Sequence, residues 1–189
     1  MRVIAGKYRS RALVAPRGVD TRPTSDRLRE TLFNVLAPRM EGAMFLDLYA
    51  GSGANGIEAL SRGAAGVVFV EKAAAAIAAI RSNLKSLGIS EGFQLDTRSV
   101  ATSLKHLQEQ RQSFDIVFLD PPYKNADQYA RTLEALGGPQ ERLLAPGAVV
   151  VAEHSRKQSL DEIYGSLQRY RLLEQGDAAL SYYRNGTAA

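Results

Sequence analysis

The sequence of 189 residues contains no cysteine and only two histidines, His106 and His154. The absence of cysteine excludes a disulfide framework, a cysteine-ligated metal and a thiol nucleophile. The two histidines are far apart in the sequence and lack the spacing of metal ligands, so we expect surface or strand-end positions for both. No metal site is predicted.

Long apolar runs are absent as well. No segment approaches the ~20 apolar residues that span a bilayer, and the N-terminus lacks the hydrophobic region of a signal peptide. We therefore expect a cytoplasmic protein without a membrane segment. With 45% hydrophobic residues the chain can bury one good core, so the natural expectation is a single domain with a small appendage.

The excess of positive charge lies at the N-terminus. The chain has a net charge of +4, and residues 1–42 hold nine Lys and Arg against four Asp and Glu. Two short β-prone pieces flank residues 6–10, which predicts a small basic hairpin. Its cations, including Arg9 and Arg11, would bind phosphate backbones through counterion release. The alternative is a solvated basic arm without a partner.

A helix is predicted after this hairpin. Thr24 or Ser25 can serve as its N-cap, apolar residues then repeat at helical spacing, and Pro38 ends the pattern. The apolar positions are most simply core. The remaining candidates for lining a site are Arg22, Thr24, Arg27 and Asn34. We predict residues 1–40 as a basic RNA-binding extension and residues 41–189 as the main domain.

Residues 45–60 follow the pattern of a strand, a tight glycine loop and a helix. Gly51 and Gly53 remove side chains where the backbone turns and a ligand approaches the main chain, while Gly56 lets the helix pack close to the strand. Free N–H groups at the helix start favour an anionic ligand group. Asp47, at the end of the strand, is expected to face the ligand crevice.

A second apolar run, residues 66–70, closes with Glu71, twenty residues after Gly51. An acid at that distance commonly accepts hydrogen bonds from ribose hydroxyls. The two segments together predict a nucleotide cradle. The alternative is an ordinary strand-to-helix turn followed by a solvated acid.

Helical and strand-like patterns alternate along the rest of the chain. The predicted helices are residues 73–87, 100–110 and 126–136, and the predicted strands are residues 93–95, 114–119, 147–152, 170–173 and 180–183. Such alternation is typical of an α/β fold with a doubly wound, mainly parallel sheet.

The strand at residues 114–119 ends in Asp120-Pro121-Pro122-Tyr123. The two prolines fix φ and remove backbone donors, which makes a rigid turn directly after a buried strand. The carbonyls and the Asp120 carboxylate remain as acceptors, which suits an amino group attached to a nucleobase. Tyr123 offers a flat face on which an extruded base can stack. The alternative is a structural turn in which Tyr123 only packs.

The motifs at residues 47–53 and 120–123 together resemble the cofactor and catalytic motifs of class I S-adenosylmethionine-dependent amino methyltransferases. Residues 2–7, 22–34 and 58–64 are similar to the RsmD family, and the likeness covers nearly the whole chain. It implies a Rossmann-like fold and S-adenosyl-L-methionine as the cofactor. It also implies methylation of N2 of guanine 966 in the 16S rRNA of the small ribosomal subunit. We expect a monomer.

The resemblance also implies roles for individual residues. The methionine part of the cofactor would lie against the loop from Asp47 to Gly53, which includes Tyr49 and Gly51. The cofactor-binding residues further along the chain would be Glu71 and Lys72 at the ribose and Arg98 and Ser99 near the adenine, with Asp96 as a fallback.

On the substrate side, Asp120 and the Pro121 carbonyl would orient the guanine amino group, Pro122 would stiffen the turn and Tyr123 would stack on the base. The resemblance places Arg22, Thr24 and Arg27 near this site.

Three other functions stay open. A nicotinamide oxidoreductase would use the glycine turn and Glu71 equally well, but it leaves residues 120–123 unexplained. A non-catalytic RNA-binding module could retain a vestigial cradle. A DNA adenine N6-methyltransferase shares the catalytic motif, although the chain is short for an added target-recognition domain.

Overall fold

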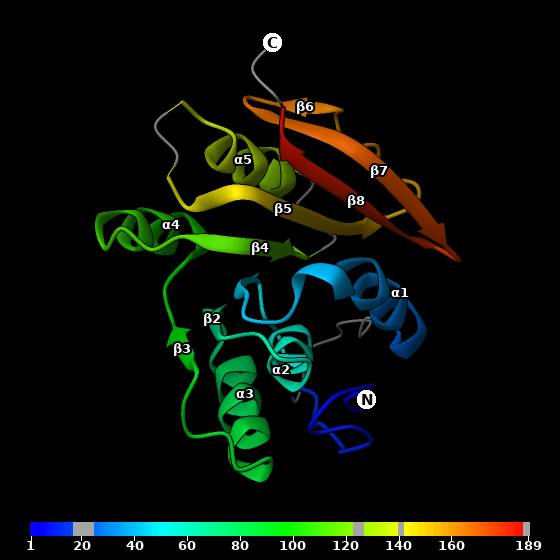
Figure 1. Ribbon diagram of the computed structural model, residues 1–189, viewed down its shortest axis with the longest axis vertical. Helices are drawn as coiled ribbons and strands as arrows, with labels where there is room; N and C mark the ends of the chain where they lie inside the picture. The colour runs from blue at the N-terminus through cyan, green and yellow to red at the C-terminus, as the bar shows by residue number, and fades with distance from the viewer. Residues whose placement is uncertain (17–24, 123–126, 140–141, 187–189) are drawn as a thin grey trace.

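The computed structural model describes residues 1–16, 25–122, 127–139 and 142–186. One eight-stranded sheet runs through this part of the chain in the order β3-β2-β1-β4-β5-β8-β7-β6 (Figure 1). Five strands are parallel: β1 (Met44–Leu48), β2 (Gly66–Val70), β3 (Phe93–Asp96), β4 (Phe114–Leu119) and β5 (Leu144–Ser155). Three are antiparallel: β6 (Ile163–Tyr164), β7 (Leu167–Gln175) and β8 (Ala178–Asn185).

The helices cover both faces of the sheet, so the predicted doubly wound α/β fold is confirmed. One core cluster joins the sheet to α1 (Asp26–Leu36), α2 (Ala54–Ser61) and α3 (Ala74–Ser86), and we call this face the α1 side. A second cluster joins the opposite face to α4 (Val100–Glu109) and α5 (Asp127–Leu136), and we call it the α4 side. Burial of apolar side chains on both faces explains the continuous apolar runs of the parallel strands.

Most predicted elements are found close to their predicted bounds. Ser25 caps α1 and accepts a hydrogen bond from the Leu28 N–H at 3.1 Å. Pro38 lies within a single 3₁₀ turn, η1 (Ala37–Arg39), which extends the helix instead of ending it abruptly. β5 is longer than the predicted residues 147–152, and β6 was not predicted.

The N-terminal segment, residues 1–16, forms the predicted small hairpin, although these described residues contain no regular strand. It turns back on itself through an antiparallel bridge between Arg2 and Ala12, and its two arms are joined by backbone hydrogen bonds from Val3 to Arg11 at 3.0 Å and from Leu13 to Met1 at 3.0 Å. Several of its N–H groups also point to α2: the Glu58 carboxylate accepts from Ile4 at 2.8 Å and from Ala5 at 3.0 Å. The hairpin is therefore held both by its own backbone hydrogen bonds and by a buried acid on a neighbouring helix.

We expect Gly6→Ala to release this segment from α2. Gly6 has φ +81°, and an added Cβ would lie 1.7 Å from the Ser61 carbonyl oxygen. Strain and overpacking of this kind cost about 1–3 kcal/mol. Urea unfolding should show this loss. The matched control is Gly88→Ala, since Gly88 also has a positive φ but no atom within 4 Å of an added Cβ. Equal losses for the two variants would contradict the clash.

Candidate functional site

The loops that carry the predicted site residues meet at one rim of the sheet. β1 lies between β2 and β4, with Leu48 in register with Val70 on one side and with Leu119 on the other. The segments after these strands therefore begin at the same edge. The strand order reverses direction between β1 and β4, which is the place where open α/β sheets bind ligands. Gly51 and Asp120 both follow strands that end at this point.

The three glycines of the loop serve different purposes. Gly56 is required by packing, since an added Cβ would lie 2.2 Å from Phe69 Cε1. Gly53 has φ +77° and begins α2, and its neighbours are the side chains of Ile80 and Phe69. Gly51 has φ +57°, and the nearest atom to an added Cβ is 4.0 Å away. Among these three, Gly51 is therefore the one beside open space that a ligand can enter.

Glu71 joins the second strand to this loop. Its Oε2 accepts a hydrogen bond from the Gly51 N–H at 2.9 Å, and its Oε1 accepts from the Ala73 N–H at 2.8 Å. The carboxylate is half-buried, and Lys72 beside it is exposed. Each carboxylate oxygen has a further lone pair, so Glu71 can still accept a hydroxyl of a ribose.

Asp47 lies beneath the loop rather than in an open crevice, which corrects the expectation from the sequence. It is 1% exposed, and its Oδ2 accepts a hydrogen bond from the Gly56 N–H at 2.9 Å. Burial raises the pKa of Asp47 to about 8, the Gly56 N–H opposes this shift, and the nearby charge of Glu71 adds to it. Asp47 therefore fixes the start of α2.

Tyr49 also differs from its predicted position. Its φ of +60° turns the chain out of the strand, and its hydroxyl forms a 2.9 Å hydrogen bond with Thr132 Oγ1 on α5. The phenol ring packs on the α4 side. The hydroxyl of Tyr49 is therefore tied to α5, and its main chain begins the glycine loop.

The segment after β3 carries a local ion pair. Arg98 Nε and Nη2 donate to the two carboxylate oxygens of Asp96 at 2.8 and 2.9 Å. Ser99 is the N-cap of α4, where its hydroxyl accepts from the Thr102 N–H at 3.3 Å. Both predicted residues therefore lie at the rim, and their side chains bind neighbouring groups of the protein.

The turn after β4 presents acceptors at the same rim. Burial, followed by the charges of Glu153 and Asp47, raises the pKa of Asp120 well above its usual range. The Tyr129 hydroxyl lies 2.9 Å from the Glu153 carbonyl and 3.4 Å from the Pro121 carbonyl. Because the closer carbonyl takes the better hydrogen bond, the Pro121 oxygen keeps capacity to accept from a substrate amine. Pro122 is exposed, and Tyr123 lies outside the described residues.

A family model described as "Conserved hypothetical protein 95" matches residues 1–184. The Bacillus subtilis (strain 168) protein named "Putative rRNA methyltransferase YlbH" is 38% identical over 184 residues, 97% of this chain and 98% of that one. Ribosomal RNA small subunit methyltransferase D of Escherichia coli (strain K12) is 33% identical over 186 residues, 97% of this chain and 89% of that one. The chain belongs to the RsmD family.

A solved structure supports the same fold. The structure titled "Putative methyltransferase yhhF from Escherichia coli" has a TM-score of 0.80 and 32% identity, and the match covers 98% of this chain and 97% of that one. The resemblance to the RsmD family and the class I methyltransferase fold, both predicted from the motifs, are confirmed.

Two residues of this RsmD-family chain were missed by the sequence analysis. Glu153 follows Ala152, which pairs with Leu119 of β4, so it lies next to Asp120 at the rim and is 3% exposed. It closes an apolar run in the same way as Asp47 and Glu71, and this signal could have identified it. Because side chains alternate along strands, Asp47, Asp120 and Glu153 all lie on the α1 side.

Arg29 of α1 is the second residue that was missed. It is fully buried, donates to the Arg2 carbonyl at 2.6 Å and to Asp26 Oδ1 at 2.8 Å, and the charges of Glu58 and Glu153 also act on it. Burial lowers its pKa, and these acids oppose the shift. Arg29 precedes the buried residues Leu32, Phe33 and Leu36 by three, four and seven positions. This helical spacing could have predicted that Arg29 lies on the face of α1 that packs against the core.

The predicted substrate residues are only partly described. Arg9, Arg11 and Arg27 are exposed, and Arg11 Nη2 donates to the Ser86 carbonyl at 3.1 Å. Arg22 and Thr24 lie outside the described residues. Asn34 is exposed on α1. The described cations are therefore available on the surface of the N-terminal part of the RsmD-family chain.

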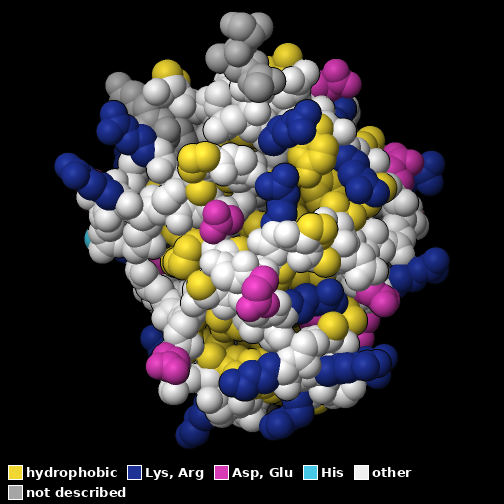
Figure 2. Space-filling model, viewed as in Figure 1, with side chains coloured by type: hydrophobic (Ala, Val, Ile, Leu, Met, Phe, Trp, Pro, Cys, Tyr) yellow, Lys and Arg dark blue, Asp and Glu magenta, His cyan; other side chains and the backbone are white. Residues whose placement is uncertain are grey.

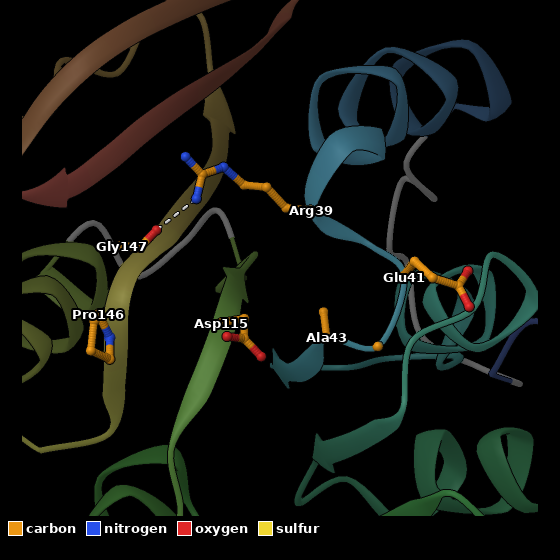
Figure 3. A pocket seen from close by; sticks show the side chains of 7 residues that line it. Arg39, Glu41, Ala43, Asp115, Pro146 and Gly147 are labelled. Carbon is orange, nitrogen blue, oxygen red and sulfur yellow. Dashed lines mark hydrogen bonds between the residues drawn. The ribbon is translucent and has the colours of Figure 1, made fainter.

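A cavity of about 250 Å³ lies at the opposite edge of the sheet (Figure 3). Its lining includes Ala43 before β1, Asp115 near the start of β4 and Gly147 in β5, whose carbonyl accepts from Arg39 Nη1 at 2.8 Å. The candidate site is at the other ends of β1 and β4. The cavity is therefore separate from it.

Within the described ranges, no group of three or more His, Cys, Asp or Glu side chains is arranged to hold a metal ion. In the same part of the chain, no helix is long and apolar enough to cross a membrane. His154 lies near the end of β5 as predicted, but it is buried, and its Nε2 is 2.9 Å from Ser181 Oγ.

Proposed function

We propose that this protein is an S-adenosylmethionine-dependent methyltransferase that modifies the N2 amino group of guanine 966 in the 16S rRNA of the small ribosomal subunit, in the cytoplasm. The observation that carries the proposal is the meeting of two loops at the switch point of the sheet. The open glycine turn at Gly51 follows β1, and the acceptors Asp120 and Pro121 follow the neighbouring strand β4. The names of the relatives support rRNA as the substrate class.

The residues at the rim fit the cofactor. The open space beside Gly51 admits a ligand to the main chain, the N–H groups at the start of α2 suit a carboxylate, and Glu71 can accept ribose hydroxyls. Arg98 and Ser99 lie where the adenine is expected. S-adenosylmethionine, when bound, supplies an electrophilic methyl group on a sulfonium, so the protein need not build a strong nucleophile.

The chain's own task is to orient the amine. The Asp120 carboxylate and the Pro121 carbonyl accept the two amino hydrogens, which directs the nitrogen lone pair toward the methyl group. Orientation of this kind can contribute about 7–11 kcal/mol to the lowering of the barrier. The raised pKa of Asp120 makes its carboxylate a better acceptor for the proton that the nitrogen loses after transfer.

The test is incubation of the protein with labelled S-adenosylmethionine and small ribosomal subunits from a strain that lacks the enzyme, followed by nucleoside analysis. We expect N2-methylguanosine. Label in N6-methyladenine of DNA would favour the DNA methyltransferase. Absence of single-turnover transfer would favour the non-catalytic RNA-binding module. Tight NADH binding without S-adenosylmethionine binding would favour the oxidoreductase.

We expect the double variant Arg9→Ala and Arg11→Ala to bind the RNA more weakly. The dependence of log K on log[salt] should also become less steep, by about 0.7–0.9 for each phosphate that the variant no longer neutralises. The measurement is a salt titration of binding to small ribosomal subunits. An unchanged slope would assign the two arginines to a solvated arm without a partner.

A further inference from the structure

The outer part of β7 and β8 carries a second basic and aromatic surface. We call the surface formed by Arg39, Tyr170, Arg171 and Arg184 the β7–β8 patch. All four residues are exposed, and Tyr170 keeps 41% of its surface open to solvent. Figure 2 shows basic side chains set among hydrophobic ones over the part of the surface where Figure 1 draws β7 and β8.

The patch is built on ordered contacts. The Arg184 guanidinium lies 5.2 Å from the centroid of the Tyr170 ring, and the Tyr170 ring lies 6.3 Å from that of Tyr182. Tyr182 is fully buried in the core and pairs with Arg171 across the strands. Arg39 is held by its hydrogen bond to the Gly147 carbonyl at 2.8 Å (Figure 3). Tyr170 is therefore a fixed aromatic platform with cations around it.

The charges that reach Tyr170 are all positive. Burial raises the pKa of the Tyr170 hydroxyl, and Arg39, Arg171 and Arg184 act against this shift. Such a surface attracts a polyanion. An aromatic ring among arginines also provides a stacking face for unpaired bases together with phosphate contacts on either side.

The patch lies away from the reacting atoms. Arg184 pairs with Val149, and Arg171 reaches the level of Val151 through its pairing with Tyr182, so Glu153 at the rim lies two to four residues further along β5, or roughly 7–13 Å at the rise of a strand. The patch is therefore set back from the rim along β5, and its residues lie on the outer strands β7 and β8 and beside η1. Tyr182 belongs to the core cluster of the α1 side, and the N-terminal segment packs against the same cluster through Val3 and Leu13. One extended RNA can therefore contact both basic surfaces.

We propose that the β7–β8 patch is a second binding surface for the substrate rRNA, which holds a single-stranded part of it away from the target guanine. The arginines bind phosphates, and an unpaired base stacks on Tyr170. The assignment rests on the proposed function for the identity of the RNA. A protein partner is less suited to this surface, because a patch of three arginines around one exposed ring is complementary to a phosphate backbone.

The experiment compares the double variant Arg171→Ala and Arg184→Ala with the control double variant Lys105→Ala and Arg142→Ala. The control removes the same charge from exposed positions at or beside α4, on the other side of the sheet. The probes are small ribosomal subunits that lack the modification and a single-stranded RNA oligonucleotide. We expect the Kd of the patch variant for both probes to rise about tenfold, with a salt slope about 1.4–1.8 less steep. S-adenosylmethionine affinity should stay unchanged.

Two single variants test the stacking role. Tyr170→Ala should weaken binding of the oligonucleotide several-fold, while Tyr170→Phe should bind like the wild type because the ring is kept. The proposal is overturned if the patch variant keeps the Kd and salt slope of the control, or if Tyr170→Ala binds like Tyr170→Phe. Oligonucleotide binding does not require methyl transfer, so failure of the proposed function would be seen separately, as loss of transfer by the wild type.

Discussion

Replacement of Asp120 by alanine is expected to lower the rate of methyl transfer by about 10²–10⁴-fold, the range attributed to a positioned acid or base. The carboxylate acts on the amino group of the base and not on the cofactor. Affinity for S-adenosylmethionine should therefore change little. Single-turnover transfer to small ribosomal subunits measures the first effect, and equilibrium titration of the cofactor measures the second.

A matched control for this variant is available on the same strand. Asp115 lies near the start of β4, at the opposite edge of the sheet, where its Oδ2 accepts from the Met44 N–H at 2.8 Å. Asp115→Ala removes the same charge and one backbone hydrogen bond, but it should leave transfer near the wild-type rate. Retained turnover in Asp120→Ala, or an equal loss in both variants, would show that Asp120 does not act on the amine.

The candidate site was largely predictable because its elements are local in sequence and its geometry follows from a general rule. The apolar runs that end near Asp47, Glu71 and Asp120 can be recognised directly in the sequence. Once strands alternate with helices, the sheet is parallel and these ends share one rim. Gly56 was likewise predicted to let the helix pack close to the strand. The structure shows that the residue it packs against is Phe69 of β2.

Features that depend on pairing between distant segments could not be predicted in the same way. The antiparallel return of β8 against β5 joins residues about thirty positions apart, and nothing in the local pattern of β8 states its direction. Tyr49 was expected in the loop because of its position. Its positive φ instead turns its ring toward Thr132 on α5, a contact across 83 residues. Burial of Arg29 depends in the same way on Arg2 and on the packing of α1.

The same distinction applies to the acids at the rim. Asp47 was predicted as a ligand-facing group because it ends a strand, but the position of α2 determines that its carboxylate is covered. The carboxyl group of Asp47 is buried and accepts one N–H, and it adopts the protonation state that has the lower free energy in this environment. In the folded chain this is the protonated form up to about pH 8. The sequence shows the acid, and only its surroundings determine its charge.

This shift gives the second large expected effect, in the variant Asp47→Asn. The pKa of Asp47 rises from 3.8 to about 8 on folding, so between these values the native state binds more protons than the unfolded state. The free energy of unfolding contributed by this group therefore falls as pH rises from about 4 to 8, by at most about 6 kcal/mol. Asparagine keeps an oxygen for the Gly56 N–H and does not ionise. We expect Asp47→Asn to match the wild type at or below about pH 4, where Asp47 is protonated in both states, and to be several kcal/mol more stable at pH 8, as measured by urea unfolding across this range. His154 contributes equally in both proteins and cancels in the difference, whereas the pKa of Asp120 depends in part on the charge of Asp47, so Asp120 contributes to it. Parallel stability curves for the two proteins would show that Asp47 is ionised in the native state.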